Sequence, residues 1–231
     1  MHPDGTVIGR WWVCLDIGEC LIDESRAWST WAQVLEVPPV TLAAIVGAAI
    51  VRGEPLAKAL PGAIDRDDWS GIRDAFENAY GGLRAEDLYP DVLPTLAGLR
   101  AIGFNIAVIG NQPAIRRAQL LALDMDVDIV ATSGTLGAAK PDPAFFARAL
   151  NLLSSPDPSR VVYVGDRVDN DVIPSLAAGI HAVWLRRGPW GLLQQLPSDA
   201  TMIRQIQSLT ELPDLLADLT IDAGQRVQRL P

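Results

Sequence analysis

Short runs of apolar residues alternate along the chain with segments of helical periodicity. In these segments apolar residues return every three or four positions, which is typical of a helix that packs on one face. Apolar strands separated by such helices indicate an α/β protein with a Rossmann-like parallel sheet and helices on both of its faces. The predicted strands are residues 11–15, 105–109, 128–131, 161–164 and 182–185, and the clearest helices are residues 113–123, 143–152 and 171–178.

Residues that commonly start or end helices support these limits. Asp91, Asp142 and Asn170 stand where helix N-caps are expected. Gly103 and Gly179 stand at the expected helix ends. Near the C-terminus, residues 210–219 predict a short closing helix with Pro213 in its first turn, followed by a loosely held tail over residues 221–231.

The interval from residue 22 to residue 88 breaks the alternation of strands and helices. It shows one helical pattern after another, over residues 26–35, 40–51 and 68–80, and no strand pattern. We interpret residues 22–88 as an all-helical cap domain inserted after the first strand. The core domain would then comprise residues 1–21 and 89–231.

The composition limits the possible functions. The chain has 231 residues, of which 49% are hydrophobic and 20% charged, so it can bury a sizeable core. It carries 19 Lys and Arg against 28 Asp and Glu, a formal net charge of −9. Because no basic stripe is available to neutralise a phosphate backbone, nucleic acid is not expected as a partner. The acidity leaves carboxylates free to gather around a metal ion.

Cysteine usage and the apolar segments bear on the compartment. Cys14 and Cys20 cannot form a disulfide framework and are typical of reduced thiols in a cytoplasmic protein. The first residues lack a basic stretch, which argues against a signal peptide. The longest apolar stretch, residues 40–51, is too short to cross a bilayer. We therefore expect a cytoplasmic protein without a membrane partner.

Polar residues lie at or near the ends of several predicted strands. In an open parallel sheet the carboxyl ends of the strands border one crevice, where ligands bind. Each residue alone also has a structural explanation, because an Asp can end a strand in a turn and a charged loop can be solvated. Their arrival at one sheet edge would place carboxylates beside an ammonium group, and this is the basis of the functional prediction. The residues are Asp16, Gly110, Asn111, Lys140, Asp166 and Asp171.

The order of these motifs resembles that of the haloacid dehalogenase-like hydrolase superfamily. The likeness is to its phosphatase-type members, which carry a helical cap inserted after the first motif. It extends from about residue 11 to residue 215, and the lysine and final acidic motifs are specific in combination. The matching segments are residues 15–23, 109–111, 140–146 and 164–171.

The resemblance implies a Mg²⁺-dependent phosphatase that acts on a small phosphorylated metabolite. Asp16 would be the nucleophile, forming an aspartyl-phosphate that water cleaves, and Lys140 would offset the negative charge of nucleophile and phosphate. Mg²⁺ would be held by the carboxylates of Asp16 and Asp166 and by the backbone carbonyl of Gly18. Asp171 would bind the ion directly or support its ligands. The cap would close over the substrate and supply specificity.

Two positions depart from the pattern that such phosphatases usually show. Gly18 stands where a second aspartate protonates the leaving group, and the neighbouring Glu19 is one candidate replacement. Gly110 stands where a Ser or Thr hydroxyl contacts the phosphoryl oxygens. Backbone N–H groups around Gly110 and Asn111, or the Asn111 amide, are candidate replacements there. Losing a general acid lowers the rate by about 10²–10⁴-fold. If Gly18 is the limiting defect, Gly18→Asp should raise turnover on substrates with poor leaving groups more than on aryl phosphates.

These departures leave two other functions open. One is a catalytically impaired member of the superfamily that binds a phosphometabolite or a protein partner. The other is true dehalogenation, which members of this fold perform without a metal. The acidic pair Asp166 and Asp171 favours a metal site and therefore the phosphatase.

The remaining conspicuous side chains have structural explanations. Trp28, Trp31 and Trp69 are expected to pack in the core of the cap more than to stack on substrate. Residues 186–190 are expected to form a surface turn. Arg52 and Lys58 are expected on a solvated face of the cap.

Overall fold

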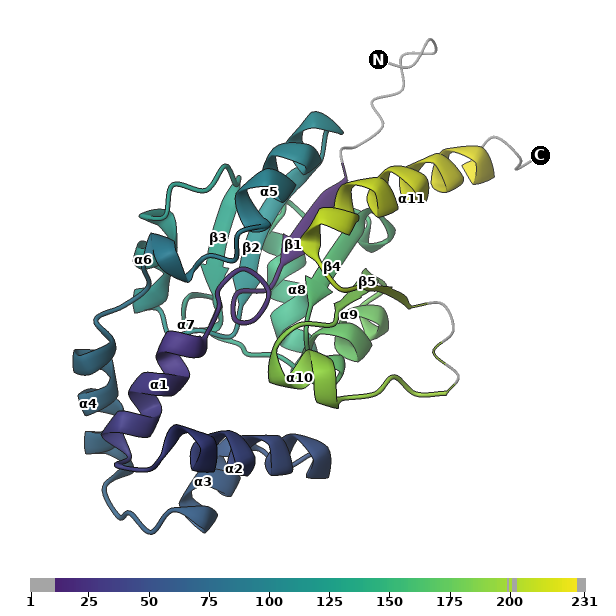
Figure 1. The fold of residues 1–231 in the computed structure, drawn as a ribbon. Coiled ribbons are helices and arrows are strands. Elements are labelled where there is room, and N and C mark those ends of the chain that lie inside the picture. Colours follow the sequence, from purple (N-terminus) through teal and green to yellow (C-terminus); the bar gives the residue numbers. More distant parts are fainter. Residues whose placement is uncertain (1–10, 199, 201–202, 228–231) are drawn as a thin grey trace.

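The chain forms a parallel sheet of six strands. The computed structural model describes residues 11–198, 200 and 203–227, with side chains up to residue 219. Among these residues the strand order is β3-β2-β1-β4-β5-β6, and neighbouring strands are parallel throughout (Figure 1). The strands are β1 Trp12–Leu15, β2 Asn105–Gly110, β3 Ile129–Thr132, β4 Val161–Gly165, β5 His181–Leu185 and β6 Arg204–Ile206.

The sequence pattern predicts five of these strands to within one residue at either end. It does not predict β6. That strand has three residues, two of which, Arg204 and Gln205, are exposed, so it shows neither an apolar run nor a clear alternation. β6 pairs with the edge of β5, where Val183 is in register with Arg204.

Helices cover both faces of the sheet. The helices outside residues 22–88 are α5 Val92–Ala101, α6 Ile115–Leu121, α7 Ser133–Leu136, α8 Pro143–Leu152, α9 Ile173–Ala177, α10 Gly188–Leu193 and α11 Leu212–Val227. Val13 and Leu15 of β1 pack in one apolar cluster with side chains of α5 and α11. Cys14, between them, faces the opposite side and packs with Phe145 and Phe146 of α8. The predicted fold class is therefore confirmed.

Two of the three expected N-caps stand at that position, and one of them, Asp142, caps its helix through its side chain. The Asp142 carboxylate accepts a hydrogen bond from the first turn of α8 at 2.8 Å. Asp91 precedes α5, but its carboxylate forms an ion pair with Arg187 and accepts a hydrogen bond from Ser208. Asn170 lies inside a single π-helical turn, η3 (Val168–Val172), that precedes α9. Asp91 therefore occupies the expected N-cap position without capping through its side chain, whereas the prediction for Asn170 was wrong because that residue lies within a turn.

The C-terminal helix is longer than predicted. α11 continues to Val227, and residues 228–231 lie outside the described residues. Residues 221–227, which were expected in the tail, are therefore helical. Leu212 and Leu216 are fully buried against the sheet, and Leu219 packs beside them, so one apolar stripe holds the first half of the helix. Pro213 lies in its first turn, as expected.

Four helices occupy the segment between β1 and α5. They are α1 Ser25–Val34, α2 Pro39–Arg52, α3 Leu56–Ala63 and α4 Trp69–Tyr80. Periodicity predicts α1, α2 and α4, whereas Pro61 and Gly62 conceal α3. The helices surround an apolar cluster of their own, to which Trp28, Trp31 and Trp69 contribute, as expected. Figure 1 shows the four helices grouped together to one side of the sheet.

α2 is the most apolar of these helices and carries some of its apolar side chains on the surface. Val40 and Val51 are 76% and 71% exposed. Arg52 and the following Lys58 are exposed and form ion pairs with Glu54, in agreement with the expected solvated face. Within the described part of the chain, no single helix is both long and apolar enough to cross a bilayer. α1 and α2, bent by 110°, meet those criteria only when they are counted together.

Two antiparallel chain segments connect the four helices to the sheet. Ile22 and Leu88 pair with each other where the chain leaves the sheet and returns to it. Arg26 of α1 forms hydrogen bonds near these paired segments. Its Nε donates to Asp87 Oδ1 at 2.8 Å, and its Nη1 donates to the carbonyl of Tyr80 at 2.7 Å. These bonds hold the start of α1 against the end of α4 and the segment that follows it.

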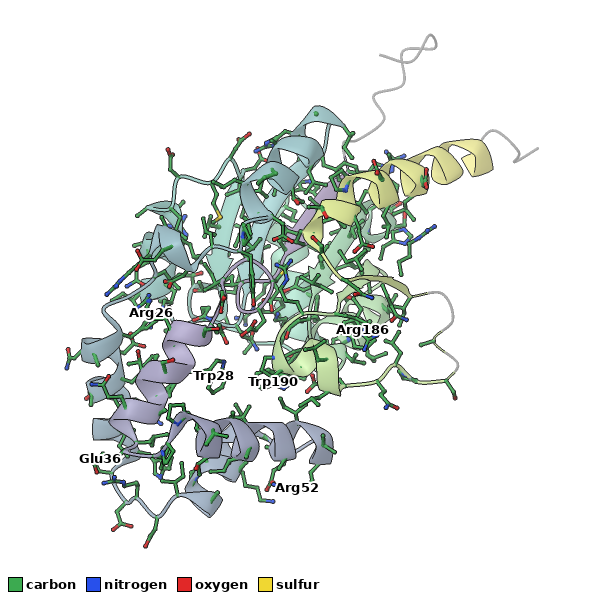
Figure 2. The ribbon with its side chains drawn as sticks, in the orientation of Figure 1. Arg26, Trp28, Glu36, Arg52, Arg186 and Trp190 are labelled. Carbon is green, nitrogen blue, oxygen red and sulfur yellow. The ribbon has the colours of Figure 1, made fainter. Side chains whose placement is uncertain are left out.

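The expected surface turn over residues 186–190 was wrong for Trp190, which is buried. Its side chain is 8% exposed and belongs to the apolar cluster of the four helices. Figure 2 shows Trp28 of α1 and Trp190 of α10 next to each other, and their ring centroids are 6.1 Å apart. The segment follows β5, and its Trp190 side chain packs against the four helices between β1 and α5. The sequence alone does not reveal this contact.

Candidate active site

Asp16 lies directly after β1, at the carboxyl end of an inner strand. Its backbone N–H donates to the carbonyl of Val164 in β4 at 2.9 Å, and the residue is 7% exposed. Its carboxylate lies against the end of β2, because a Cβ built on Gly110 would be 2.3 Å from Asp16 Oδ1. Gly110 therefore leaves room for this carboxylate, and any side chain there would have to displace it.

Lys140 brings two of the predicted site residues together. Its Nζ lies 2.7 Å from Asp16 Oδ1 and 2.5 Å from Asp171 Oδ1. The lysine is 5% exposed. It lies in the loop before α8, and the peptide bond between Lys140 and Pro141 is cis. Residues that lie far apart in the sequence thus meet at one end of the sheet, as the motif positions predict.

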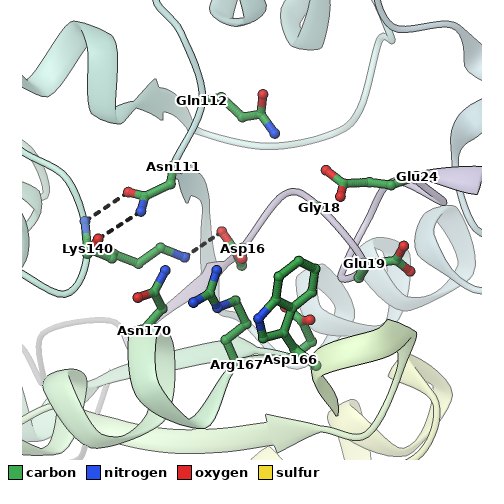
Figure 3. Close-up of a pocket in the computed structure, with 11 residues that line it drawn as sticks. Asp16, Gly18, Glu19, Glu24, Asn111, Gln112, Lys140, Asp166, Arg167 and Asn170 are labelled. Carbon is green, nitrogen blue, oxygen red and sulfur yellow. Dashed lines mark hydrogen bonds and ion pairs between the residues drawn. The ribbon is translucent and has the colours of Figure 1, made fainter. Parts of the chain in front are cut away.

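The side chain of Asn111 fixes the backbone of Lys140. Asn111 Oδ1 accepts from the Lys140 N–H at 2.8 Å, and Asn111 Nδ2 donates to the Lys140 carbonyl at 2.9 Å (Figure 3). These two bonds determine how the amide is oriented. Asn111 therefore acts on the site through Lys140, and the sequence pattern does not reveal this contact.

Asp166 and Asp171 reach the site from the end of β4 and from η3. Asp171 is 1% exposed, and its second carboxylate oxygen accepts a hydrogen bond from the Arg167 N–H at 2.9 Å. A Cβ on Gly165 would lie 2.3 Å from that carboxylate, so the glycine allows the loop to fold back over the strand. Both oxygens of Asp171 are therefore in use, one by Lys140 and one by the loop backbone.

The cluster fits a divalent cation. Asp16, Asp166 and Asp171 each offer one carboxylate oxygen, and the three atoms lie within 4.8 Å of one another. All three residues are buried, and Lys140 supplies one positive charge against their three negative charges. Hard oxygen donors with excess negative charge are the environment that Mg²⁺ prefers. The donor set and the charge balance both match the predicted metal.

Burial and like charge shift the pKa values of the cluster. Burial raises the pKa of Asp166 well above that of an ordinary carboxyl, and the charges of Asp171 and Asp16 raise it further. Burial raises the pKa of Asp171 as well, although Lys140 opposes that shift. Burial alone would lower the pKa of Lys140, but Asp16 and Asp171 raise it, so the lysine stays charged. A bound cation would relieve the repulsion among the carboxylates.

A carboxylate that the sequence analysis did not consider lies beside Gly18. A Cβ built on Gly18 would lie 2.4 Å from Glu24 Oε1, so the Glu24 carboxylate takes the space next to this glycine. Glu19 points elsewhere: its Oε2 accepts a hydrogen bond from Tyr89 Oη at 2.6 Å. Figure 3 shows the carboxylate of Glu24 directed toward Gly18 and that of Glu19 directed away. Burial raises the pKa of Glu24 to about 8, with smaller contributions from Glu19 and Asp16.

A cavity of about 180 Å³ opens over these groups. Most of the predicted site residues line it, but Gly110 and Asp171 do not. Three further side chains that the sequence analysis did not assign to the site, Glu24, Gln112 and Trp190, line it as well. No sequence pattern marks these three residues as part of the site. Glu24, for example, is an acidic residue before a helix, which is typical of a helix start. The lining residues are Asp16, Gly18, Glu19, Glu24, Asn111, Gln112, Lys140, Asp166, Arg167, Asn170 and Trp190.

A second cavity of about 240 Å³ lies between the sheet and the inserted helices. Four aromatic side chains line it, Trp28, Trp31, Phe76 and Tyr80, and we call it the aromatic cavity, although Glu24, Glu77 and Arg116 line it as well. The Trp31 and Phe76 rings are stacked, with centroids 4.1 Å apart. Glu24 and Gln112 line both cavities, so they mark the boundary between the polar and the aromatic one.

Comparison with known proteins agrees with this geometry. Residues 12–179 match the model of the haloacid dehalogenase-like hydrolase family. Because this match covers most of the chain, the protein belongs to the haloacid dehalogenase-like hydrolases, a family of hydrolytic enzymes.

Two curated relatives are phosphatases by name. The chain is 33% identical over 137 residues to glyceraldehyde 3-phosphate phosphatase of Methanopyrus kandleri, which covers 58% of each protein. It is 33% identical over 119 residues to phosphoserine phosphatase of Thermus thermophilus, covering 50% of this chain and 47% of that protein. The chain thus matches about half the length of each relative.

The fold itself recurs in solved structures. Magnesium-bound YfnB of Bacillus subtilis aligns with a TM-score of 0.69 over 90% of this chain and 99% of its own. The two chains are only 14% identical, so this likeness concerns the arrangement of sheet and helices alone. It extends through the inserted helices as well as the sheet, because the alignment covers nearly the whole chain.

Proposed function

We propose that the protein is a Mg²⁺-dependent phosphatase that hydrolyses a small phosphorylated metabolite through a phosphorylated Asp16. The observation that carries this proposal is the meeting of Asp16, Lys140 and Asp166 in one buried cluster at the carboxyl end of the sheet. The phosphatase names of the curated relatives support the same reaction class.

Asp16 supplies the attacking oxygen in this proposal. Its carboxylate is buried and borders the polar cavity, so it can meet a phosphoryl group that enters there. Lys140 holds the carboxylate at 2.7 Å and offsets the repulsion between two anions. Backbone N–H groups around Gly110 and Asn111 donate to the phosphoryl oxygens in place of a hydroxyl.

Asp16, Asp166 and the backbone carbonyl of Gly18 are the proposed ligands of Mg²⁺, which supplies positive charge to the phosphoryl oxygens when bound. Asp171 does not bind the ion in this proposal, because its two oxygens already accept bonds from Lys140 and from the Arg167 N–H. It instead positions Lys140, which in turn contacts Asp16. Of the two roles expected for Asp171, this is the one that its contacts favour.

The helices between residues 22 and 88 form the proposed cap domain, on a core of residues 1–21 and 89–231. The paired segments at Ile22 and Leu88 fit this division. The aromatic cavity between cap and core is suited to the organic part of a small phosphomonoester, while the polar cavity takes the phosphoryl group. Specificity then resides mainly in the cap.

Phosphate release from a panel of metabolites, measured with Mg²⁺ and with a chelator, tests the proposal. The panel starts from glyceraldehyde 3-phosphate, phosphoserine and phosphoglycolate, the substrates that curated relatives are named for. We expect turnover that requires Mg²⁺ and that is abolished in Asp16→Asn. Asp67→Asn, at an exposed position of the cap, is the matched control and should keep full activity.

Two other outcomes would replace the proposal. Tight binding of phosphate mimics without turnover of any panel member would identify a catalytically impaired binding protein, which Gly18 and Gly110 make the main alternative. Metal-independent halide release from 2-haloacids would identify a dehalogenase. Both assays use the same purified chain.

A further inference from the structure

The proposed reaction, on which this inference rests, requires a proton donor at the leaving oxygen. When Asp16 attacks a phosphate ester of an aliphatic alcohol, the departing oxygen becomes a strongly basic alkoxide unless it is protonated. The donor must therefore lie in the cavity, close to the bond that breaks. Asp16 is the nucleophile, Lys140 is held between two carboxylates and Asp166 is assigned to the metal.

Two carboxylates among the cavity-lining residues are not used in this way, Glu19 and Glu24. Glu19 accepts a 2.6 Å hydrogen bond from Tyr89 Oη, and its carboxylate turns away from Asp16 (Figure 3). The backbone turns sharply at Glu19, with a φ of 52°. Glu19, the replacement considered from the sequence, is therefore badly placed for proton transfer.

Glu24 occupies the required position. Its Oε1 would be 2.4 Å from a Cβ on Gly18, the second residue after the nucleophile, so a carboxylate is present at that point without being attached to it. Glu24 also lines both the polar and the aromatic cavity. The scissile bond of a phosphomonoester joins its phosphoryl group to its organic part, and it must therefore lie at the boundary where Glu24 stands.

We propose that Glu24, the residue just before α1, is the proton donor and acceptor of the reaction. In the first half, an Asp16 oxygen forms a bond to phosphorus, the bond from phosphorus to the leaving oxygen breaks, and the Glu24 carboxyl proton passes to that oxygen. An alcohol leaves and aspartyl-phosphate remains. In the second half, water attacks phosphorus, Glu24 takes a proton from it, and the bond between phosphorus and Asp16 breaks. Phosphate leaves with both carboxyl groups restored.

Leaving-group dependence tests Glu24. The substrates are p-nitrophenyl phosphate, whose leaving group needs no proton, and the alkyl phosphate that the wild type hydrolyses fastest in the panel. We expect Glu24→Gln to lower kcat on the alkyl phosphate by about 100-fold or more and to affect release of the first p-nitrophenol much less. Because water activation also slows, p-nitrophenol should appear in a burst of about one equivalent per enzyme.

Two further variants complete the design. Glu19→Gln is the matched control, and its ratio of aryl to alkyl turnover should equal that of the wild type. The double variant Gly18→Asp with Glu24→Ala places the carboxylate on residue 18 and removes the Glu24 side chain that fills the space beside it. Hydrolysis of the alkyl phosphate should then recover relative to Glu24→Gln. If Glu24→Gln does not fold, this double variant decides: recovery supports the proposal, and a folded but inactive protein overturns it.

The outcomes separate this inference from the proposed function. A wild type without Mg²⁺-dependent phosphatase activity would refute the proposed function itself. An active wild type would overturn the role of Glu24 alone if Glu24→Gln slowed release of the first leaving group equally from both substrates, or did not slow it at all. Selective loss on the alkyl phosphate, together with the burst, supports it, because a merely structural role does not discriminate between leaving groups.

Discussion

The side-chain amide of Asn111 bridges the backbone N–H and carbonyl of Lys140, at 2.8 and 2.9 Å. This contact joins the end of β2 to the loop before α8 and sets the direction from which the Lys140 ammonium approaches Asp16. A residue at the end of β2 therefore fixes the backbone of Lys140.

Asn111→Ala should therefore impair catalysis through Lys140. Loss of both bonds frees the Lys140 backbone, and a displacement of about 1 Å in a catalytic group lowers the rate by up to roughly 100-fold. We expect kcat to fall by roughly 10–100-fold and the protein to remain folded in thermal melts. Asn151→Ala, on the surface of α8, is the control and should leave kcat unchanged. Wild-type kinetics in Asn111→Ala would show that Lys140 does not depend on this bridge.

Gly110→Ser, which restores a hydroxyl, should lower activity. Its Cβ would lie 2.3 Å from Asp16 Oδ1, so the carboxylate must move away from Lys140. We expect at least about a 10-fold loss of kcat/KM, equivalent to about 1.4 kcal/mol of transition-state stabilisation. Gly110→Ala should lose as much, because the steric conflict comes from Cβ. Gly62→Ala in α3, where a Cβ meets no neighbour within 4 Å, should have no effect. A gain of activity in Gly110→Ser would contradict the steric argument.

Lys140→Met should destabilise the metal-free protein. It leaves Asp16 and Asp171 buried without their counter-charge, which typically lowers the free energy of unfolding by about 3–5 kcal/mol. Mg²⁺ should raise the melting temperature of the variant more than that of the wild type, because the cation replaces part of the lost charge. Lys58→Met, at a position 79% exposed, should change stability by less than about 1 kcal/mol. Equal melting temperatures for Lys140→Met and the wild type would show that the carboxylates are neutral without the lysine.

The stability of the metal-free protein should depend on pH through Glu24. Burial raises the pKa of Glu24 in the folded protein to about 8, above its ordinary value of 4.5. The folded state therefore binds this proton more tightly than the unfolded state does, so the stabilisation is complete below pH 4.5 and is lost as the pH rises through about 8. In chelator, the free energy of unfolding of the wild type relative to Glu24→Gln should fall between pH 5 and pH 9. Parallel pH profiles for the two proteins would disagree with a partly buried, protonated Glu24.

Arg116 of α6 and Glu77 of α4 should couple the inserted helices to the sheet. Arg116 is 4% exposed and donates to both Glu77 oxygens, at 2.8 and 2.7 Å, while the Glu77 side chain is 43% exposed. A double-mutant cycle with Arg116→Met and Glu77→Met should give a coupling energy of about 1–2 kcal/mol, between the values typical of exposed and buried pairs. Strictly additive effects on the free energy of unfolding would show that the pair contributes nothing to docking.

The sequence was sufficient for the sheet and for much of the polar cluster, for a physical reason. Parallel strands that are buried on both faces are apolar throughout, so Trp12–Leu15 and Val161–Gly165 stand out, and the residues after them must share one edge of the sheet. The meeting of Asp16, Asp166 and Lys140 follows from that topology. The family resemblance added the chemistry expected of those groups.

The contacts of Glu24, Asn111 and Trp190 could not be predicted in this way. Glu24 reaches Gly18 because the chain turns between them, with the N–H groups of residues 21 and 22 both bonded to the Ile17 carbonyl. Such contacts depend on loop conformation, which leaves no periodic signal in the sequence. Gly18→Asp alone is therefore no longer expected to raise turnover, because the Glu24 carboxylate already fills the space beside residue 18.

Glu24 belongs to the inserted segment, whereas Asp16 belongs to the sheet. If Glu24 carries the proton, a chimera that exchanges residues 22–88 for the insertion of another family member replaces the acid together with the substrate-binding walls. Such a chimera would need an aspartate at position 18 to remain active on alkyl phosphates. Under the proposed mechanism, selectivity and proton transfer would be inherited together, and recombination at the paired Ile22 and Leu88 would separate both from Asp16.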